Sequence, residues 1–100
     1  MMGNSMKSAA ILMQGRVADA EDGDVDALFE LGIAFSTGAP GVDVDLIAAH
    51  KWFNLAALNG SERGQECRAD IAYEMSAREI AEAQKQARAW LAVTQRRLAA

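Results

Sequence analysis

Hydrophobic side chains recur every three or four residues along most of the chain, the spacing that gathers them on one side of an α-helix. Leu28, Leu31 and Phe35 follow this spacing, and so do Trp52 and Leu55. Alanine is abundant whereas valine, threonine and aromatic residues are sparse, so the composition also favours helix over strand. The chain is therefore expected to be all-α, with helices at about residues 5–20, 25–37, 44–59, 61–74 and 76–98.

Turn and capping residues mark the breaks between these segments. Gly23 can adopt the left-handed conformation that ends a helix, and Asp24 can cap the next one. Pro40 lies in a glycine-flanked loop and cannot continue a helix. Ser76 and Glu79 have the spacing of a capping box, in which each side chain accepts a hydrogen bond from the backbone amide of the other residue. These breaks are short, so neighbouring helices are expected to run antiparallel.

An internal period accompanies the helical pattern. Ala49 and Trp52 recur as Ala87 and Trp90, 38 residues later. Periods of this length are typical of α/α solenoids, in which each helix pair buries its apolar face against the next pair. The chain is expected to form one domain, residues 1–100, that is a short solenoid of about five antiparallel helices. It would hold one full repeat at about residues 24–60 and an atypical C-terminal capping hairpin at about residues 61–100.

Residues 27–60 carry a spaced pattern of small, aromatic and glycine residues, from Ala27, Phe29 and Leu31-Gly32 through Gly41, Asp45 and Trp52 to Ala56-Ala57 and Gly60. This pattern resembles the signature of the Sel-one-like repeat family, which is related to the tetratricopeptide repeats. The match departs from the family at Ala39-Pro40, which stand where the family has one residue, and Arg68-Ala69 replace Leu-Gly in the second unit. The resemblance implies a scaffold for protein interactions with no chemistry of its own. The residues that carry it, all with structural roles, are Ala27, Phe29, Leu31, Gly32, Phe35, Gly38, Gly41, Asp45, Ala49, Trp52, Ala56, Ala57 and Gly60.

Charge and cysteine content narrow the possible partners and compartment. The formal net charge of −4 argues against a protein whose main task is to neutralise phosphates. Arg78, Lys85 and Arg88 follow a predicted turn, so a helix-turn-helix nucleic-acid-binding regulator is kept as an alternative. Cys67 is the only cysteine and can form no internal disulfide. No apolar run approaches the length of a membrane span, and we expect a cytoplasmic protein.

The residues most often used in catalysis have simpler explanations here. His50 is the only histidine, and a general base would need a nucleophile or carboxylate within reach. Helical spacing brings Lys51 and Asn54 near it, with Asp43 to Asp45 about a turn away, and we expect an exposed structural or interface residue.

Cys67 is expected to face the core as a small apolar side chain. Trp52 and Trp90 occupy equivalent places in their units, which favours core packing over ligand stacking. The sequence predicts no catalytic residue, cofactor or metal site and no enzyme activity.

The function expected from this pattern is a protein–protein interaction module or adaptor that docks a helix or an extended peptide across its stacked helices. The partner is another protein whose identity the sequence does not give. Self-association is the related alternative, in which the overhanging last helix, or Met6, Met13 and Val17 of the first helix, would be covered by a second copy.

Overall fold

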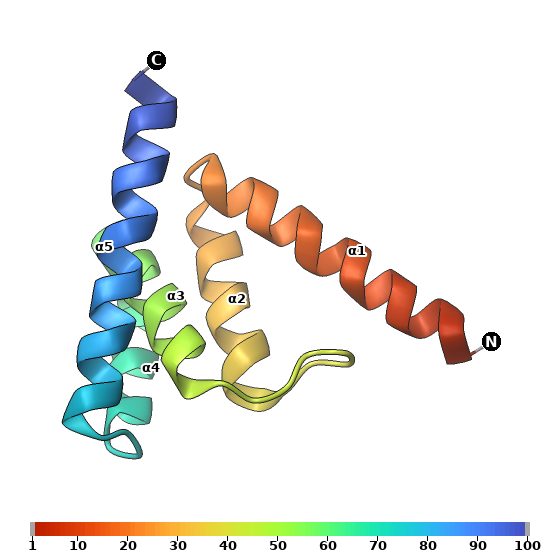
Figure 1. Ribbon diagram of the computed structural model, residues 1–100, viewed down its shortest axis with the longest axis horizontal. Helices are drawn as coiled ribbons and strands as arrows, with labels where there is room; N and C mark the ends of the chain where they lie inside the picture. Colours follow the sequence, from red (N-terminus) through yellow and green to blue (C-terminus); the bar gives the residue numbers. More distant parts are fainter. Residues whose placement is uncertain (1, 100) are drawn as a thin grey trace.

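The computed structural model describes the backbone of residues 2–99 and the side chains of residues 11–96, and this part of the chain is all-α, as the sequence predicts. Five helices follow one another without a strand between residues 2 and 99 (Figure 1). They are α1 (Met2–Glu21), α2 (Val25–Thr37), α3 (Leu46–Leu58), α4 (Glu62–Ala72) and α5 (Ala77–Ala99).

Aspartate side chains begin α2 and α3. The Asp24 carboxylate accepts hydrogen bonds from the backbone amides of Asp26 (2.9 Å) and Ala27 (3.2 Å), and Gly23 before it has a φ of +90°. The Asp45 carboxylate accepts one from the amide of Ala48 at 3.0 Å. Each carboxylate satisfies amides that the first helical turn leaves free, and its charge is favourable at the positive end of the helix dipole. The Asp24 cap predicted from the sequence is confirmed.

Serine side chains begin α4 and α5. The Ser61 hydroxyl accepts a hydrogen bond from the amide of Gly64 at 2.9 Å. At the start of α5 the amide of Ser76 donates to the Glu79 carboxylate (2.8 Å) and the amide of Glu79 donates to the Ser76 hydroxyl (3.1 Å). This reciprocal pair confirms the predicted capping box, so the last two helices are separated by the turn that the sequence specifies.

Three predicted boundaries are wrong by two residues or more, one of them the end of the fourth helix, which lies at Ala72 rather than near residue 74. The first helix already includes Met2, where frayed residues were expected before Ser5, because nothing in this segment interrupts the helical hydrogen bonding. The predicted contribution of Met6 lies outside the described side chains.

The third helix begins at Leu46 rather than near residue 44. Asp45 has an extended backbone, with φ −146°, because it serves as the cap.

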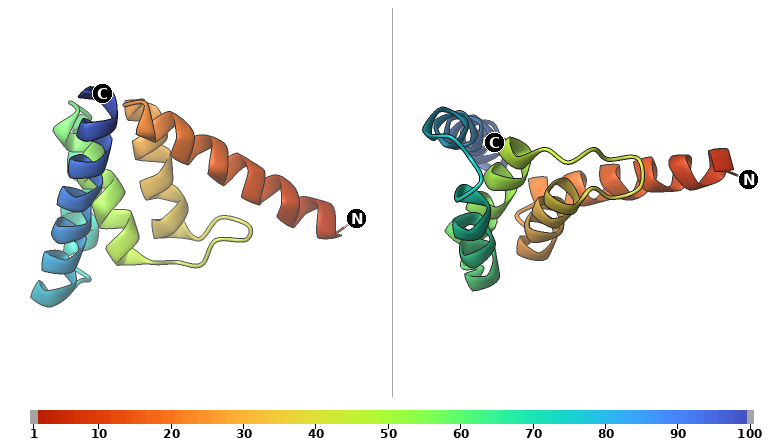
Figure 2. Two further views of the ribbon diagram at one scale, coloured as in Figure 1. Left: turned by 45° about the horizontal axis from the view of Figure 1, so that its top comes forward. Right: turned by 90° about the horizontal axis from the view of Figure 1, so that it is seen from below.

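Helix α3 lies at the centre of the fold. It packs against α2 on one side and against both α4 and α5 on the others, while α1 packs against α2 (Figure 2). Because three helices cover α3, six of its 13 residues are buried, including Ala49, Phe53 and Leu55. The connected core is formed by Ala20, Ala27, Leu28, Leu31, Trp52, Leu55, Ala56 and Ala87.

Helices α4 and α5 pack chiefly against α3 rather than against each other. The sequence describes residues 61–100 as a capping hairpin, and the structure differs in that the two helices do not share a large interface. A short turn connects α4 to α5. The buried side of α5 carries Ala83 and Ala87, whose small side chains let this helix lie close to α3. The chain therefore ends as two helices laid separately on α3.

Glycine permits two close approaches around Phe53. A Cβ atom added at Gly32 of α2 would overlap the Phe53 ring of α3. A Cβ at Gly64 of α4 would lie only 3.0 Å from the Ala56 Cβ and 3.1 Å from the Phe53 carbonyl oxygen. The mid-helix glycines that weaken α2 and α4 locally thus allow both helices to reach α3.

Candidate docking surface

Two tryptophans and a lysine meet where α3 and α5 pack together. The Trp52 and Trp90 rings form an edge-to-face pair with centroids 4.7 Å apart and an interplanar angle of 78°. The Lys51 Nζ lies 4.4 Å from the centre of the Trp52 ring and 5.3 Å from that of Trp90. A cation in this position is attracted by the negative face of an indole ring, by about 0.5–2 kcal/mol. The lysine is thus held against the rings instead of extending into water.

A shallow hollow of about 390 Å³ opens beside this cluster. We call the residues that line it the Trp90 surface: Lys51, Gln86, Ala89, Trp90 and Val93. Val93 is 62% exposed, Ala89 is exposed and Trp90 is half-buried, so apolar groups face water here. Because Gln86, Ala89, Trp90 and Val93 are three or four residues apart along α5, they lie on one side of that helix. The surface is apolar with a single cation at its edge.

Lys51 has no ionic partner within the described part of the chain. Among the residues whose side chains are described, the ion pair is Arg16 Nε to Glu30 at 3.2 Å, on α1 and α2. Burial lowers the pKa of the Lys51 ammonium group, which means that protein atoms replace part of its water without a carboxylate to compensate. A carboxylate brought to this position by a ligand would supply that missing charge.

A second hollow, of about 650 Å³, lies between the loop that follows α2 and the start of α5. Phe35 and Val44 line it together with three carboxylates, Asp43, Asp45 and Glu79. Two of these carboxylates already cap α3 and α5. The hollow is therefore largely built from residues that begin helices, and we do not assign it a ligand.

His50 is buried, with 3% of its surface exposed, so the expectation of an exposed histidine was wrong. The reason is that α4 and α5 both cover α3, which leaves little of that helix for solvent. Burial, and then the positive charge of Arg68, lower the pKa of the imidazole. Its Nδ1 atom is buried and makes no hydrogen bond with the described residues. Arg68 itself donates a hydrogen bond to the Asn54 side chain.

This environment predicts a pH dependence of stability. The pKa of His50 in the folded chain lies below the ordinary value of 6.5, so the unfolded chain takes up a proton first as pH falls. The contribution is complete above pH 6.5 and is lost on acidification toward the folded-state pKa. Urea unfolding at several pH values from 7.5 to 5.5 should show wild-type stability falling, with a smaller slope for His50→Gln. Equal slopes for the two proteins would contradict this account of the imidazole.

Cys67, which the sequence predicts to face the core, is half-buried on α4, so its burial is only partial. Its helix packs closely on α3 at Gly64, one turn earlier. Burial, and then the Asp70 carboxylate, raise the pKa of the thiol, while Arg63 acts in the opposite direction. The thiol is therefore mainly protonated near neutral pH, a state that reacts slowly.

Most residues of the predicted repeat signature are buried or half-buried in the fold. Among them, only Trp52 belongs to the cluster of Lys51 and the two tryptophans beside the Trp90 surface. The Phe29 and Phe53 rings are in contact, with their centroids 5.7 Å apart. On the Phe29 ring lies the Arg63 guanidinium, 4.5 Å from the ring centroid. The buried members are Ala27, Leu31, Gly32, Ala49, Trp52 and Ala56; the half-buried ones are Phe29, Phe35 and Ala57. Asp45 caps α3, and the glycines with positive φ are Gly38, Gly41 and Gly60.

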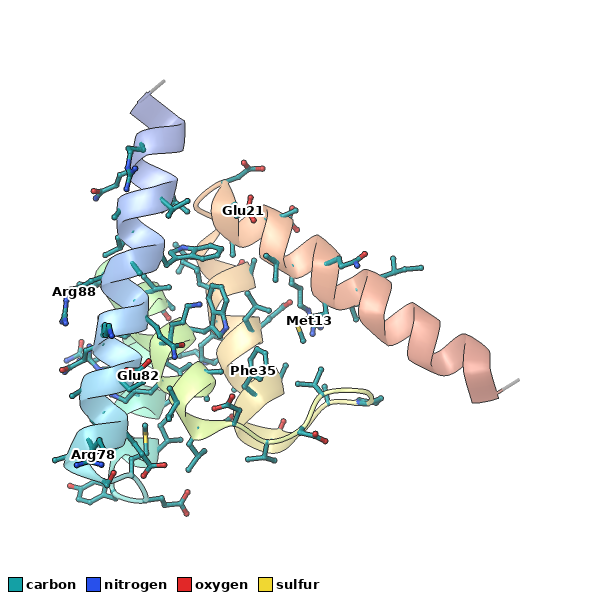
Figure 3. All side chains as sticks on the ribbon, in the orientation of Figure 1. Met13, Glu21, Phe35, Arg78, Glu82 and Arg88 are labelled. Carbon is teal, nitrogen blue, oxygen red and sulfur yellow. The ribbon has the colours of Figure 1, made fainter. Side chains whose placement is uncertain are left out.

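The basic residues of α5 do not gather on a single positive surface. In Figure 3, Arg78 and Arg88 point away from α1 and α2, on the outer side of α5. Glu82 lies between them in the sequence, and Gln86 donates a hydrogen bond to its carboxylate at 3.2 Å. The described outer face of α5 thus mixes both signs of charge.

Sequence reasoning missed the non-tryptophan members of the Trp90 surface. Lys51 directly precedes Trp52, yet the sequence predicts it only as a neighbour of His50 on the same helix. The α5 members could have been found from their helical spacing around Trp90. Only the structure shows that α3 packs against α5, which brings Lys51 next to the α5 members of the surface.

Comparisons with protein-family models, curated proteins and solved structures gave no match to this chain. Within the described residues, no group of three or more histidine, cysteine, aspartate or glutamate side chains is arranged to hold a metal ion. None of the described helices has both the length and the apolar composition needed to cross a membrane.

Proposed function

We propose that this chain is a non-enzymatic protein-interaction module that docks an amphipathic helix of another protein on the Trp90 surface. The observation that carries the proposal is Lys51, a lysine without a carboxylate partner among the described residues, held over two indole rings beside exposed apolar side chains. Buried aromatic anchors with polar groups at their edge are typical of surfaces that bind other proteins.

The chemistry of the surface defines the expected ligand. An apolar side chain of the partner would cover Ala89 and Val93, and a carboxylate on the same helix face would reach the Lys51 ammonium group. A helix supplies both at fixed spacing, since residues three, four and seven apart share a face. Rigid helices position the surface, so little ordering is needed when the ligand binds.

We also propose that the chain is a short α/α scaffold of the Sel-one-like repeat type, as its sequence pattern suggests. Helix α3 supports this proposal because it packs against helices that precede and follow it, as a central repeat helix does. We also propose a cytoplasmic location, where a lone half-exposed thiol such as Cys67 stays reduced.

Site-specific photo-crosslinking tests the proposed function. A photoreactive amino acid placed at Ala89 on the Trp90 surface is compared with the same residue at Ala69, an exposed alanine of α4 that serves as the matched control. We expect the Ala89 position to give discrete protein adducts that Lys51→Glu removes, and the Ala69 position to give none of them. Adducts of equal yield from both positions, or adducts that Lys51→Glu leaves unchanged, would count against this surface.

A further inference from the structure

The exposed side of α1 carries apolar residues that nothing in the described fold covers. Ile11 is 68% exposed and Leu12 is 54% exposed, and this half of the helix extends away from the other helices (Figures 1 and 2). The opposite side of α1 is occupied, because Met13 and Val17 pack on the core. The remaining helix face is therefore available to a partner.

The same face of α1 ends in negative charge. Asp19 follows Leu12 by seven residues, which is two helical turns, so both side chains lie on one side of the helix. The Asp19 carboxylate is exposed and forms no ion pair within the part of the chain that the structure describes. The α1 surface, which we define as Ile11, Leu12, Gly15, Ala18 and Asp19, thus combines apolar or small residues with a carboxylate.

The α1 surface and the Trp90 surface carry opposite charges, and the segments that contribute to each surface differ in the same sense. Residues 17–30 contain six acidic residues and no lysine or arginine. Residues 77–97, which form most of α5, contain five basic residues and two acidic ones. Lys51 is the only aspartate, glutamate, lysine or arginine of α3. The α1 surface thus carries one negative charge, at Asp19, and the Trp90 surface carries one positive charge, at Lys51, and both surfaces are present in every copy.

We propose that a second copy of this chain docks its α1 surface on the Trp90 surface. This inference rests on the proposed function of the Trp90 surface as a helix-docking site, with a second copy of the chain in place of a different protein as the partner. Gln86 and Val93 are seven residues apart on α5, as Leu12 and Asp19 are on α1, and both pairs span about 10 Å along their helices. An antiparallel alignment places Leu12 against Val93 and Asp19 beside Gln86 and Lys51. Reciprocal docking uses both surfaces of both copies and closes a dimer.

The solution mass over a dilution series, measured by light scattering, tests this contact. Wild-type protein should show twice the 10.7 kDa mass of one chain at high concentration and dissociate on dilution, more readily in high salt. Lys51→Glu and Asp19→Lys should each remain monomeric at concentrations where the wild type is a dimer. Because each variant keeps the group that the other lacks, their equimolar mixture should recover the dimer. Lys85→Glu and Glu66→Lys, on exposed positions outside both surfaces, are the matched controls.

Two outcomes would overturn the inference. One is a wild-type mass of a single chain at all concentrations, and the other is a dimer that neither substitution weakens. Leu12→Asp provides an independent variant, since Leu12 is exposed and its replacement leaves the folded core intact, and it should also be monomeric. A monomeric wild type that still gives Ala89 crosslinks to a different protein would exclude the second copy while supporting the proposed function.

Discussion

Replacing Phe53 with alanine is expected to lower the free energy of unfolding by about 3–5 kcal/mol. The Phe53 side chain is 1% exposed and is the largest of the fully buried side chains in the described part of the fold. Its ring lies over Gly32 of α2 and contacts Phe29 with the centroids 5.7 Å apart. The substitution leaves a cavity at the centre of the fold, where α2 and α4 both meet α3.

Urea unfolding followed by circular dichroism measures this loss. Tyr73→Ala is the matched control, because Tyr73 is 91% exposed and its removal should change stability by less than about 0.5 kcal/mol. If Phe53→Ala and Tyr73→Ala were equally stable, the packing of α2 and α4 on α3 would be contradicted. A Phe53→Leu variant, which retains part of the volume, is expected to fall between wild type and Phe53→Ala if the alanine variant does not fold.

Replacing Gly32 with alanine is expected to destabilise the chain by about 1–3 kcal/mol, although alanine is the better helix former. The added methyl group would overlap the Phe53 ring, so α2 and α3 would have to separate or the ring would have to move. Gly15→Ala is the matched control, since Gly15 is also within a helix but a Cβ there meets no atom within 4 Å. Gly15→Ala should stabilise α1 by up to about 1 kcal/mol.

The two glycine variants are compared by the same unfolding experiment. A gain of stability from both substitutions would show that Phe53 does not lie against Gly32. If the overlap is the cause, Gly32→Ala should cost less in a Phe53→Leu background than in the wild type, because the two residues are in contact and their effects are not additive.

Local features of the sequence were sufficient to predict the helices and most of the turns. Asp24 and the Ser76–Glu79 capping box act on amides within three residues, so their hydrogen bonds follow from spacing alone. The same holds for the positive φ of Gly23. These interactions need no knowledge of how the helices are arranged.

Burial around α3 depends on the arrangement of the helices and was not predictable from periodicity. His50 is buried because both α4 and α5 lie on α3, whereas a hairpin of α4 with α5 would have left more of α3 exposed. Cys67 follows the apolar spacing of α4, yet its side chain is only half-buried. A helical pattern shows which residues share a side of a helix and does not show which partner covers that side.

The candidate site was predicted only in part for the same reason. The equivalent positions of Trp52 and Trp90 indicate that both tryptophans pack in their units, and the structure adds that they contact each other. Lys51 becomes prominent only through its distances to both rings. The sequence therefore did not predict that a lysine charge belongs to this surface, because the packing of α3 against α5 is what brings Lys51 there.

The claim that another chain covers the Trp90 surface is tested most directly by fluorine-19 NMR of the chain labelled with 5-fluorotryptophan. The chain contains two tryptophans, so Trp90 and Trp52 give two resonances that Trp90→Phe assigns. Spectra are recorded of the labelled chain alone, with an excess of the unlabelled chain, and in complex with any other protein that is crosslinked through Ala89. The account predicts that the Trp90 resonance shifts and loses its sensitivity to exchange of H₂O for D₂O. A complex that forms while the Trp90 resonance and its solvent sensitivity stay unchanged would contradict it.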